Sequence, residues 1–401
     1  MSFAKYDLLA PIRDPRRLRF VSASGAALTG EDGRQYVDMN EMCKVLGQRN
    51  AAFNRAVAEA LDGITTDKQG VSEATARLYQ YLVESTNGDF AGIHLCSSGS
   101  EAVEWAVRLA KRMTGRTEVL SFWNSIHGRT YLSASISGLP RRKAGYGPLA
   151  PGAVFAPYPR CRDCNQGHLC KDGRFECLER LKSDYRYSSA QDLAAVIVEP
   201  YQGADVTVPP EGYLRALWQW AKEQGMMFIA DEIQSGLGRT GEMYCYQREG
   251  IRPDMLLLGK ALGNGMHISA LLVRELPDKA ALPAISGGTG DDAVACAAAC
   301  EVFRQLEDGL LEQVRQVGGS LVEGLQALRK YECVRDVRGL GLAAAVEFQT
   351  EEQGGRVWQA MRDRGYFTGH VGKTVHVKPP YVLTERQVDR FLAELEEVIR
   401  A

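Results

Sequence analysis

The segment Met227-Phe-Ile-Ala-Asp-Glu-Ile-Gln234 decides the fold that we expect for this chain. An apolar run ends at Asp231, and the polar, glycine-rich stretch Ser235-Gly-Leu-Gly-Arg-Thr-Gly241 follows it. In an open α/β sheet, ligands bind beyond the carboxyl ends of the strands. The segment therefore predicts a strand that places Asp231 beside a bound group, although a strand-end Asp that only caps a turn is equally compatible with these residues alone.

Strand-like and helical patterns alternate on both sides of this segment. Short apolar runs bounded by glycine and polar residues predict strands, and apolar positions at helical spacing predict the helices between them. Such alternation indicates an α/β fold with a mostly parallel sheet. The predicted strands cover residues 93–96, 118–122, 193–199, 226–231 and 255–258, and the helices include 100–113 and 212–223.

The two ends of the chain follow a different pattern. Residues 1–50 contain short strand-like pieces separated by turns, whereas the region after residue 290 predicts two long helices and then mixed strands and helices. A chain of 401 residues is long enough for roughly two domains. We expect a large domain over residues 51–290 and a smaller α+β domain built from both termini, residues 1–50 and 291–401.

Composition narrows the class of protein. Hydrophobic residues make up 45% of the chain and the formal net charge is −2, so neither nucleic acid nor a membrane is an expected partner. No stretch is long and apolar enough to span a bilayer, and the N-terminus lacks the pattern of a signal peptide. We therefore expect a cytoplasmic protein whose ten cysteines are mostly reduced thiols.

A lysine directly follows another apolar run, in Met255-Leu-Leu-Leu-Gly-Lys260. Such a lysine is costly to bury unless a group pairs with its amine, and a desolvated amine has a lowered pKa and attacks carbonyls. Lys260 is thus a candidate for a lysine that forms a Schiff base. A lysine that extends from a strand end to solvent is the commoner case for this pattern taken alone.

The stretch Cys96-Ser-Ser-Gly-Ser-Glu-Ala102 lies between a predicted strand and a predicted helix. Small residues at a helix N-terminus expose main-chain N–H groups, and the helix dipole favours an anion there. Gly99 and Ser100 are therefore candidates to bind a phosphate. A plain serine N-cap explains the same stretch without any ligand.

These three features occur in the order of fold-type I enzymes that use pyridoxal 5′-phosphate (PLP): a phosphate site, an Asp at one strand end, and a Lys at a later strand end. The chain resembles the class III aminotransferases, the ω-aminotransferase or ornithine/diaminopelargonate type, nearly end to end. The matching segments are Tyr36-Val-Asp38, Ser98-Gly-Ser-Glu-Ala102, His127-Gly-Arg-Thr130, Val198-Glu-Pro-Tyr-Gln-Gly203, Asp231-Glu-Ile-Gln234, Gly238-Arg-Thr-Gly241, Gly259-Lys260, Val337-Arg-Gly-Leu-Gly341 and Pro379-Pro-Tyr381.

The resemblance implies PLP as the cofactor and two catalytic residues. Lys260 would hold PLP as a Schiff base and then move the proton between the substrate and the cofactor. Asp231 would pair with the pyridinium nitrogen, which makes the ring an electron sink. The reaction implied is transfer of an amino group from an amine or amino-acid donor to a ketone or aldehyde acceptor.

The resemblance also implies contacts that hold the cofactor. Gln234 would hydrogen-bond its phenolic oxygen, and Gly99 and Ser100 would bind its phosphate. His127 would lie near the ring, and Glu199 would lie on the substrate side of the pocket.

Two cofactor contacts depart from the pattern of the family. Relatives carry an aromatic residue directly before the His-Gly pair, where this chain has Ile126, so an aliphatic contact would replace ring stacking. The family is typically a homodimer with shared active sites, and the partner chain contributes a phosphate contact. Thr289 is the nearest candidate for that contact, although it falls one position away from the expected place.

The largest departure concerns the carboxylate of the substrate. Many relatives place an arginine shortly before the Pro-Pro pair, where this chain has His376, and an ornithine-type relative adds a Glu where this chain has Ala204. A bidentate carboxylate contact is poorly made by histidine or lysine. One hypothesis is a substrate without a carboxylate beside the reacting carbon. The alternative is that another arginine, Lys373 or Lys378 binds that carboxylate.

Three further questions stay open at this point. Four cysteines, Cys161, Cys164, Cys170 and Cys177, lie within seventeen residues and have the density of a zinc site, yet the second CxxC of a firm site is missing, and we predict no metal. An aminomutase, a racemase or a decarboxylating transaminase shares the fold and the lysine. The sequence also leaves open whether the amine and carbonyl substrates are free small molecules or bound to a carrier or peptide.

Overall fold

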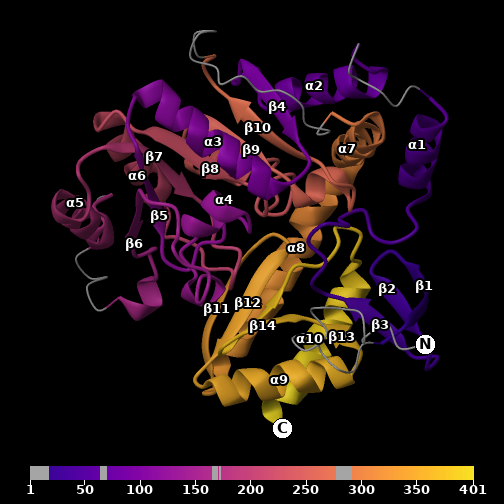
Figure 1. The fold of residues 1–401 in the computed structure, drawn as a ribbon. Coiled ribbons are helices and arrows are strands. Elements are labelled where there is room, and N and C mark those ends of the chain that lie inside the picture. The colour runs from indigo at the N-terminus through magenta and orange to yellow at the C-terminus, as the bar shows by residue number, and fades with distance from the viewer. Residues whose placement is uncertain (1–17, 64–69, 165–169, 171–172, 277–290) are drawn as a thin grey trace.

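A seven-stranded sheet forms the centre of the larger part of the molecule in the computed structural model, which describes residues 18–63, 70–164, 170, 173–276 and 291–401 (Figure 1). Its strand order is β4-β10-β9-β8-β7-β5-β6. All neighbours pair in parallel except β10, which runs antiparallel to both β4 and β9. The predicted mostly parallel sheet is confirmed. The strands are β4 Gly92–Cys96, β5 Glu118–Phe122, β6 Ala153–Ala156, β7 Leu193–Val198, β8 Met227–Asp231, β9 Met255–Leu258 and β10 Ser269–Val273.

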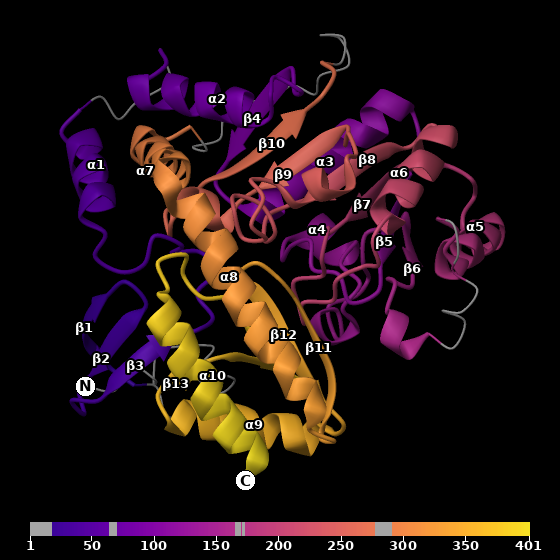
Figure 2. The ribbon, with the colours of Figure 1, turned by 180° about the vertical axis from the view of Figure 1, so that it is seen from behind.

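Alternate residues of the central strands pack into two separate hydrophobic clusters. Ala195 and Ile197 of β7 belong to the cluster under helix α3 (Gly99–Thr114), whereas Val196 and Val198 belong to the cluster under helix α6 (Tyr213–Glu223). Helices therefore cover both faces of the sheet, as Figures 1 and 2 show. This double cover explains why every residue of β7 is buried.

Two smaller sheets lie beside the large one. Strands β1 (Phe20–Ser24), β2 (Ala27–Gly30) and β3 (Gln35–Asp38) form one of them with β13 (Tyr366–Phe367), and β3 pairs with β13 in parallel. The N-terminal strands thus share a sheet with a segment near the C-terminus. The other sheet has the order β11-β12-β15-β14, with bounds Val334–Leu340, Ala343–Phe348, Thr374–Val377 and Gly369–Val371.

The remaining helices begin where capping residues predict. Thr350 and Thr384 each form a capping box, with Gln353 and Gln387, at the starts of α9 (Glu351–Asp363) and α10 (Glu385–Arg400). None of the helices in the described residues is both long and apolar enough to cross a membrane. The other helices are α1 Ala51–Leu61, α2 Glu73–Ser85, α4 Tyr131–Ser135, α5 Glu176–Ser188, α7 Ala293–Gln305 and α8 Leu311–Gln326.

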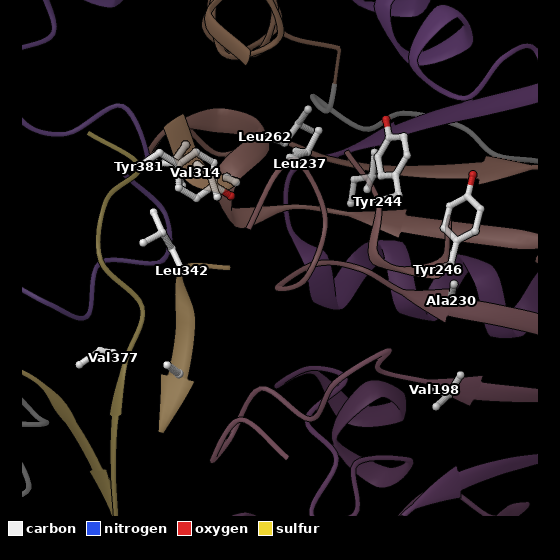
Figure 3. Close-up of a cluster of buried hydrophobic side chains, with 14 of the residues drawn as sticks. Val198, Ala230, Leu237, Tyr244, Tyr246, Leu262, Val314, Leu342, Val377 and Tyr381 are labelled. Atoms are coloured by element: carbon white, nitrogen blue, oxygen red, sulfur yellow. The ribbon is translucent and has the colours of Figure 1, made fainter. Parts of the chain in front are cut away.

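One hydrophobic cluster connects the large sheet to the C-terminal sheet. Figure 3 follows it from Val198 and Ala230 at the ends of β7 and β8, through Val314 of α8, to Leu342 just before β12 and Val377 at the end of β15. Because this packing is continuous, the carboxyl ends of the large sheet and the strands of the C-terminal sheet are held in contact with each other.

Candidate active site

The predicted site residues follow five parallel strands of the large sheet. Strands β4, β5, β7, β8 and β9 all point in the same direction, so their carboxyl ends meet at one edge. The tertiary structure thereby brings together residues that are up to 161 positions apart in the sequence. They are Gly99 and Ser100 after β4, Ile126 and His127 after β5, Glu199 after β7, Asp231 and Gln234 after β8, and Lys260 after β9.

A cleft of about 730 Å³ opens at this edge of the sheet. Among the predicted residues, its wall includes Gly99, Ser100, Ile126, His127, Gln234 and Lys260. Asp231 and Glu199 are buried directly behind that wall, with 3% and 5% of their surface exposed. Thr289 lies outside the described residues, so its contact stays a prediction.

His127 and Asp231 form a buried hydrogen-bonded pair behind the cleft. The distance from Nδ1 of His127 to Oδ2 of Asp231 is 2.7 Å, and Oδ1 of Asp231 accepts from the main-chain N–H of Ile233 at 3.2 Å. An ionised carboxylate can only accept, so the pair places a proton on Nδ1. Nε2 of His127 is buried without a partner among the described residues. The histidine therefore keeps one ring nitrogen free for a ligand.

Glu199 is held by the main chain of two loops. One carboxylate oxygen accepts from the N–H of Ile126 and the other from the N–H of Gly203, both at 2.8 Å. Burial raises the pKa of this carboxyl group, while the charge of His127 opposes the rise. Glu199 thus fixes the loop that carries Ile126 and the loop that carries Gly203 against each other.

Lys260 has an unusual backbone conformation for a lysine. Its φ is +42°, in the left-handed region that residues with a side chain seldom adopt. Burial lowers the pKa of its amine, and the charges of Asp231 and Glu199 oppose that shift. Strain of this kind is found where the surrounding fold holds a side chain in a fixed place, often at a functional site.

The amide of Gln234 lies against Gly203. A Cβ added to Gly203 would lie 2.2 Å from Nε2 of Gln234, so only glycine leaves room for that amide. Oε1 of Gln234 is buried and has no partner in the part of the chain that the structure describes. Like Nε2 of His127, this oxygen is a polar atom on the cleft wall that a ligand can satisfy.

The start of α3 forms a small cradle. Ser98 caps the helix by accepting from the N–H of Glu101, which leaves the first-turn N–H groups of Gly99 and Ser100 without helical partners. A Cβ on Gly99 would come within 2.9 Å of the Ile233 side chain. The hydroxyl of Ser100 accepts from the N–H of Arg129 at 3.0 Å. The main-chain N–H groups of the predicted phosphate site are therefore available to bind an anion.

These features fit PLP. The orphaned Nε2 of His127 and Oε1 of Gln234, the free N–H groups at the start of α3, and the amine of Lys260 converge on one cleft. They match the needs of a cofactor that carries a phosphate, a phenolic oxygen and an aldehyde.

Sequence reasoning left several cleft residues without a role. Arg129 lies in the matching segment His127-Gly-Arg-Thr130 but received none, and Arg141 and Arg142 gave no signal at all. Lys378 was named only as one alternative; it lines the cleft with 2% of its surface exposed. These three arginines and Lys378 line the cleft, and no Asp or Glu of the described residues does. The cleft wall therefore carries an excess of positive charge.

The cysteine cluster shows no metal-binding geometry in the part that is described. Cys161, Cys164, Cys170 and Cys177 are free thiols, and no three His, Cys, Asp or Glu side chains among the described residues gather as ligands. His168 lies between Cys164 and Cys170 in the sequence, but it is not among the residues that the structure describes.

Comparison with known proteins gives full-length matches. The curated acetylornithine aminotransferase of Methanopyrus kandleri is 33% identical over 404 residues, covering 99% of this chain and 97% of that protein. The acetylornithine aminotransferase of Mycobacterium bovis is 32% identical, covering 95% of this chain and 92% of that protein. The solved amine transaminase of an uncultivated Pseudomonas species, in its PLP-bound form, has a TM-score of 0.89 at 28% identity, covering 98% of this chain and 97% of that one. A family model described as "Aminotransferase class-III" matches residues 10–399, and the chain therefore belongs to the class III aminotransferases, which are PLP-dependent enzymes.

Proposed function

We propose that this aminotransferase is of the ω-type: it moves an amino group to or from a carbon that carries no adjacent carboxylate, and an amino acid with its keto acid serves as the second substrate pair. The observation that carries the proposal is the identity of two residues of the cleft wall. His376 and Ala204 line the cleft at the positions where the resemblance predicts an arginine and, in ornithine-type relatives, a glutamate. Burial, with the nearby charge of Lys378, lowers the pKa of His376 far enough to keep the imidazole neutral.

Two residues would perform the proton chemistry. The lowered pKa of Lys260 leaves more of its amine neutral, which suits it both to carry the cofactor and to move a proton at Nζ. Asp231, oriented by His127, would face the pyridine nitrogen of PLP. When bound, PLP supplies an electron sink for the substrate carbon.

Five further residues would hold the cofactor. The main-chain N–H groups of Gly99 and Ser100 suit a phosphate, and Oε1 of Gln234 could accept a hydrogen bond from a phenolic hydroxyl. Ile126 would contact the ring through its aliphatic side chain. Glu199 would act indirectly, because its carboxylate is engaged by the main chain of the two loops that it joins.

Single half-reactions test the proposal. The absorbance of PLP on the purified protein is followed as it meets amines in matched pairs, each amino acid beside the amine that lacks its carboxylate. We expect simple primary amines to convert the cofactor at rates within about tenfold of the matched acids. Conversion by α-amino acids alone would contradict the ω-type assignment, and release of no keto or aldehyde product would point to a mutase or racemase instead.

Two lysine variants, one inside the site and one outside it, test whether the loss of activity is specific to the site. Lys260→Ala should end conversion, whereas Lys222→Ala should retain it, because Lys222 of helix α6 is 45% exposed, pairs with Asp254 at 2.7 Å and does not line the cleft. Equal loss in both variants would show that the first effect is structural.

We also infer a homodimer and a cytoplasmic location. The family resemblance implies the dimer. Helix α1 packs Phe53 against the core, but Leu61 at its end is 62% exposed and is apolar surface that a partner subunit would cover. Sedimentation of the purified protein tests the assembly, and a monomer at micromolar concentration would contradict it.

A further inference from the structure

Lys378 is a buried lysine with an incomplete set of partners. It directly follows β15 and precedes Pro379, and only 2% of its surface is exposed. Its Nζ donates to the main-chain oxygen of Gly203, and no carboxylate lies within ion-pair distance of it among residues 18–63, 70–164, 170, 173–276 and 291–401. An ammonium group has three donors, so Lys378 keeps bonding capacity toward the cleft that it lines.

A second lysine of the same region shows what a structural role would look like. Lys373 is 32% exposed, and its Nζ lies 3.2 Å from a carboxylate oxygen of Glu347. It does not line the cleft. Of the two lysines that sequence reasoning considered as substitutes for the missing arginine, only Lys378 therefore faces the substrate space.

The charged groups around Lys378 do not neutralise the positive charge of its amine. Lys260 and Arg239 lower the pKa of its amine, and Glu199 and Asp205 raise it. Both acids already have other partners: Glu199 accepts from two main-chain N–H groups, and Asp205 pairs with Arg160. Burial is the largest influence, and the pKa of Lys378 falls to about 7.

We propose that Lys378 binds the carboxylate of the amino-acid and keto-acid pair, an inference that rests on the function proposed above. A substrate carboxylate supplies the negative charge that this amine lacks in the folded chain. His376, two residues earlier on β15, presents its side chain to the same face, and its buried Nδ1 has no partner among the described residues. The neutral imidazole is a second hydrogen-bonding group for the same carboxylate.

Three arginines also line the cleft, yet their setting differs. Arg129, Arg141 and Arg142 are exposed to solvent, where an ion pair contributes little to binding. The same interaction is much stronger for a desolvated amine such as that of Lys378. The geometry thus favours Lys378 as the residue that discriminates an acid from its carboxylate-free analogue.

The test uses two acceptors that differ only by a carboxylate, pyruvate and acetaldehyde. The full-length protein is loaded with pyridoxamine phosphate, and its return to the PLP spectrum is followed with each acceptor. Lys378→Met should lower kcat/KM for pyruvate relative to acetaldehyde by roughly 10- to 100-fold, the range for one charge-assisted hydrogen bond. Lys378→Arg should recover part of that ratio, and Lys373→Met, the matched control, should keep the wild-type ratio.

Each outcome decides one claim. An unchanged ratio in Lys378→Met would place the carboxylate elsewhere and overturn this inference while leaving the proposed function intact. If neither acceptor restores PLP in the wild-type protein, the proposed function fails and this inference falls with it. If Lys378→Met does not fold, Lys378→Gln gives the same comparison of pyruvate with acetaldehyde. Competition between pyruvate and propanoate in Lys378→Arg then measures binding of the carboxylate alone.

Discussion

Replacing Arg338 by Met should loosen the loop that borders the cleft. The guanidinium of Arg338, 9% exposed, donates to the main-chain oxygens of Val206 at 3.0 Å and Asp205 at 2.8 Å, and to a carboxylate oxygen of Glu347 at 3.0 Å. Val206 has a φ of +56°, which is strained for a β-branched residue. Arg338 therefore fixes a strained turn three residues beyond Gly203.

The expected loss in the free energy of unfolding follows from the hydrogen bonds that Met cannot make. Glu347 keeps ion pairs with Arg162 and Arg335, so the two carbonyl bonds account for most of the loss. At about 1.5–3 kcal/mol each, they suggest a decrease of about 3–6 kcal/mol in the free energy of unfolding. With about 2.1 cal/mol/K per residue, the unfolding entropy of the 401-residue chain is about 0.84 kcal/mol/K, so Tm should fall by about 4–7 °C.

Thermal unfolding of the PLP-loaded protein at one scan rate measures this change. Arg364→Met is the control, because Arg364 makes one surface ion pair with Glu394 at 2.9 Å and should change Tm by no more than about 1 °C. PLP affinity supplies a second measurement, since the loop that Arg338 holds also carries Gly203. A Tm within 1 °C of wild type, together with unchanged PLP affinity, would refute the argument that Arg338 holds this loop.

The remaining predictions concern the cleft. Lys260→Ala should lower the rate of amino transfer by roughly 10³-fold or more, measured as product formation with excess PLP; substantial turnover would exclude Lys260 as the proton carrier. Gly203→Ala should displace the amide of Gln234, whose Nε2 would lie 2.2 Å from the new Cβ, and weaken PLP binding to the apoprotein by about tenfold in a fluorescence titration; unchanged affinity would show that Gln234 does not contact the cofactor. Because the amine of Lys378 is charged only below its pKa of about 7, KM for pyruvate should rise above pH 7 by up to about tenfold per unit in the wild-type protein. The same profile in Lys378→Arg, which stays charged, would assign the pH dependence to another group.

Much of the fold was predictable because its signals are local. The predicted helix over 100–113 and strand over 255–258 match α3 and β9 to within one residue at each end. Strand β10 was not predicted, since Ser269–Val273 is a short apolar run that periodicity cannot assign. Its antiparallel direction depends on β4 and β9, which precede it in the chain.

The residues of the candidate site were also partly predictable from the sequence, whereas their contacts were not. Asp231 and Lys260 stand out in the sequence because each ends an apolar run, and parallel strands bring such ends to one edge. The partners that define their chemistry are not local. The bond between His127 and Asp231 spans 104 positions, and the contact between Lys378 and Gly203 spans 175.

The sequence by itself determined the alternation of strands and helices, the family resemblance, and the residues that end the central strands. Only the tertiary structure separated Lys373 from Lys378. The two residues differ by five positions and are chemically identical, yet one pairs with Glu347 and the other lines the cleft without a carboxylate. The charge state and the binding capacity of a side chain depend on its burial and its neighbours, and those neighbours come from distant parts of the chain.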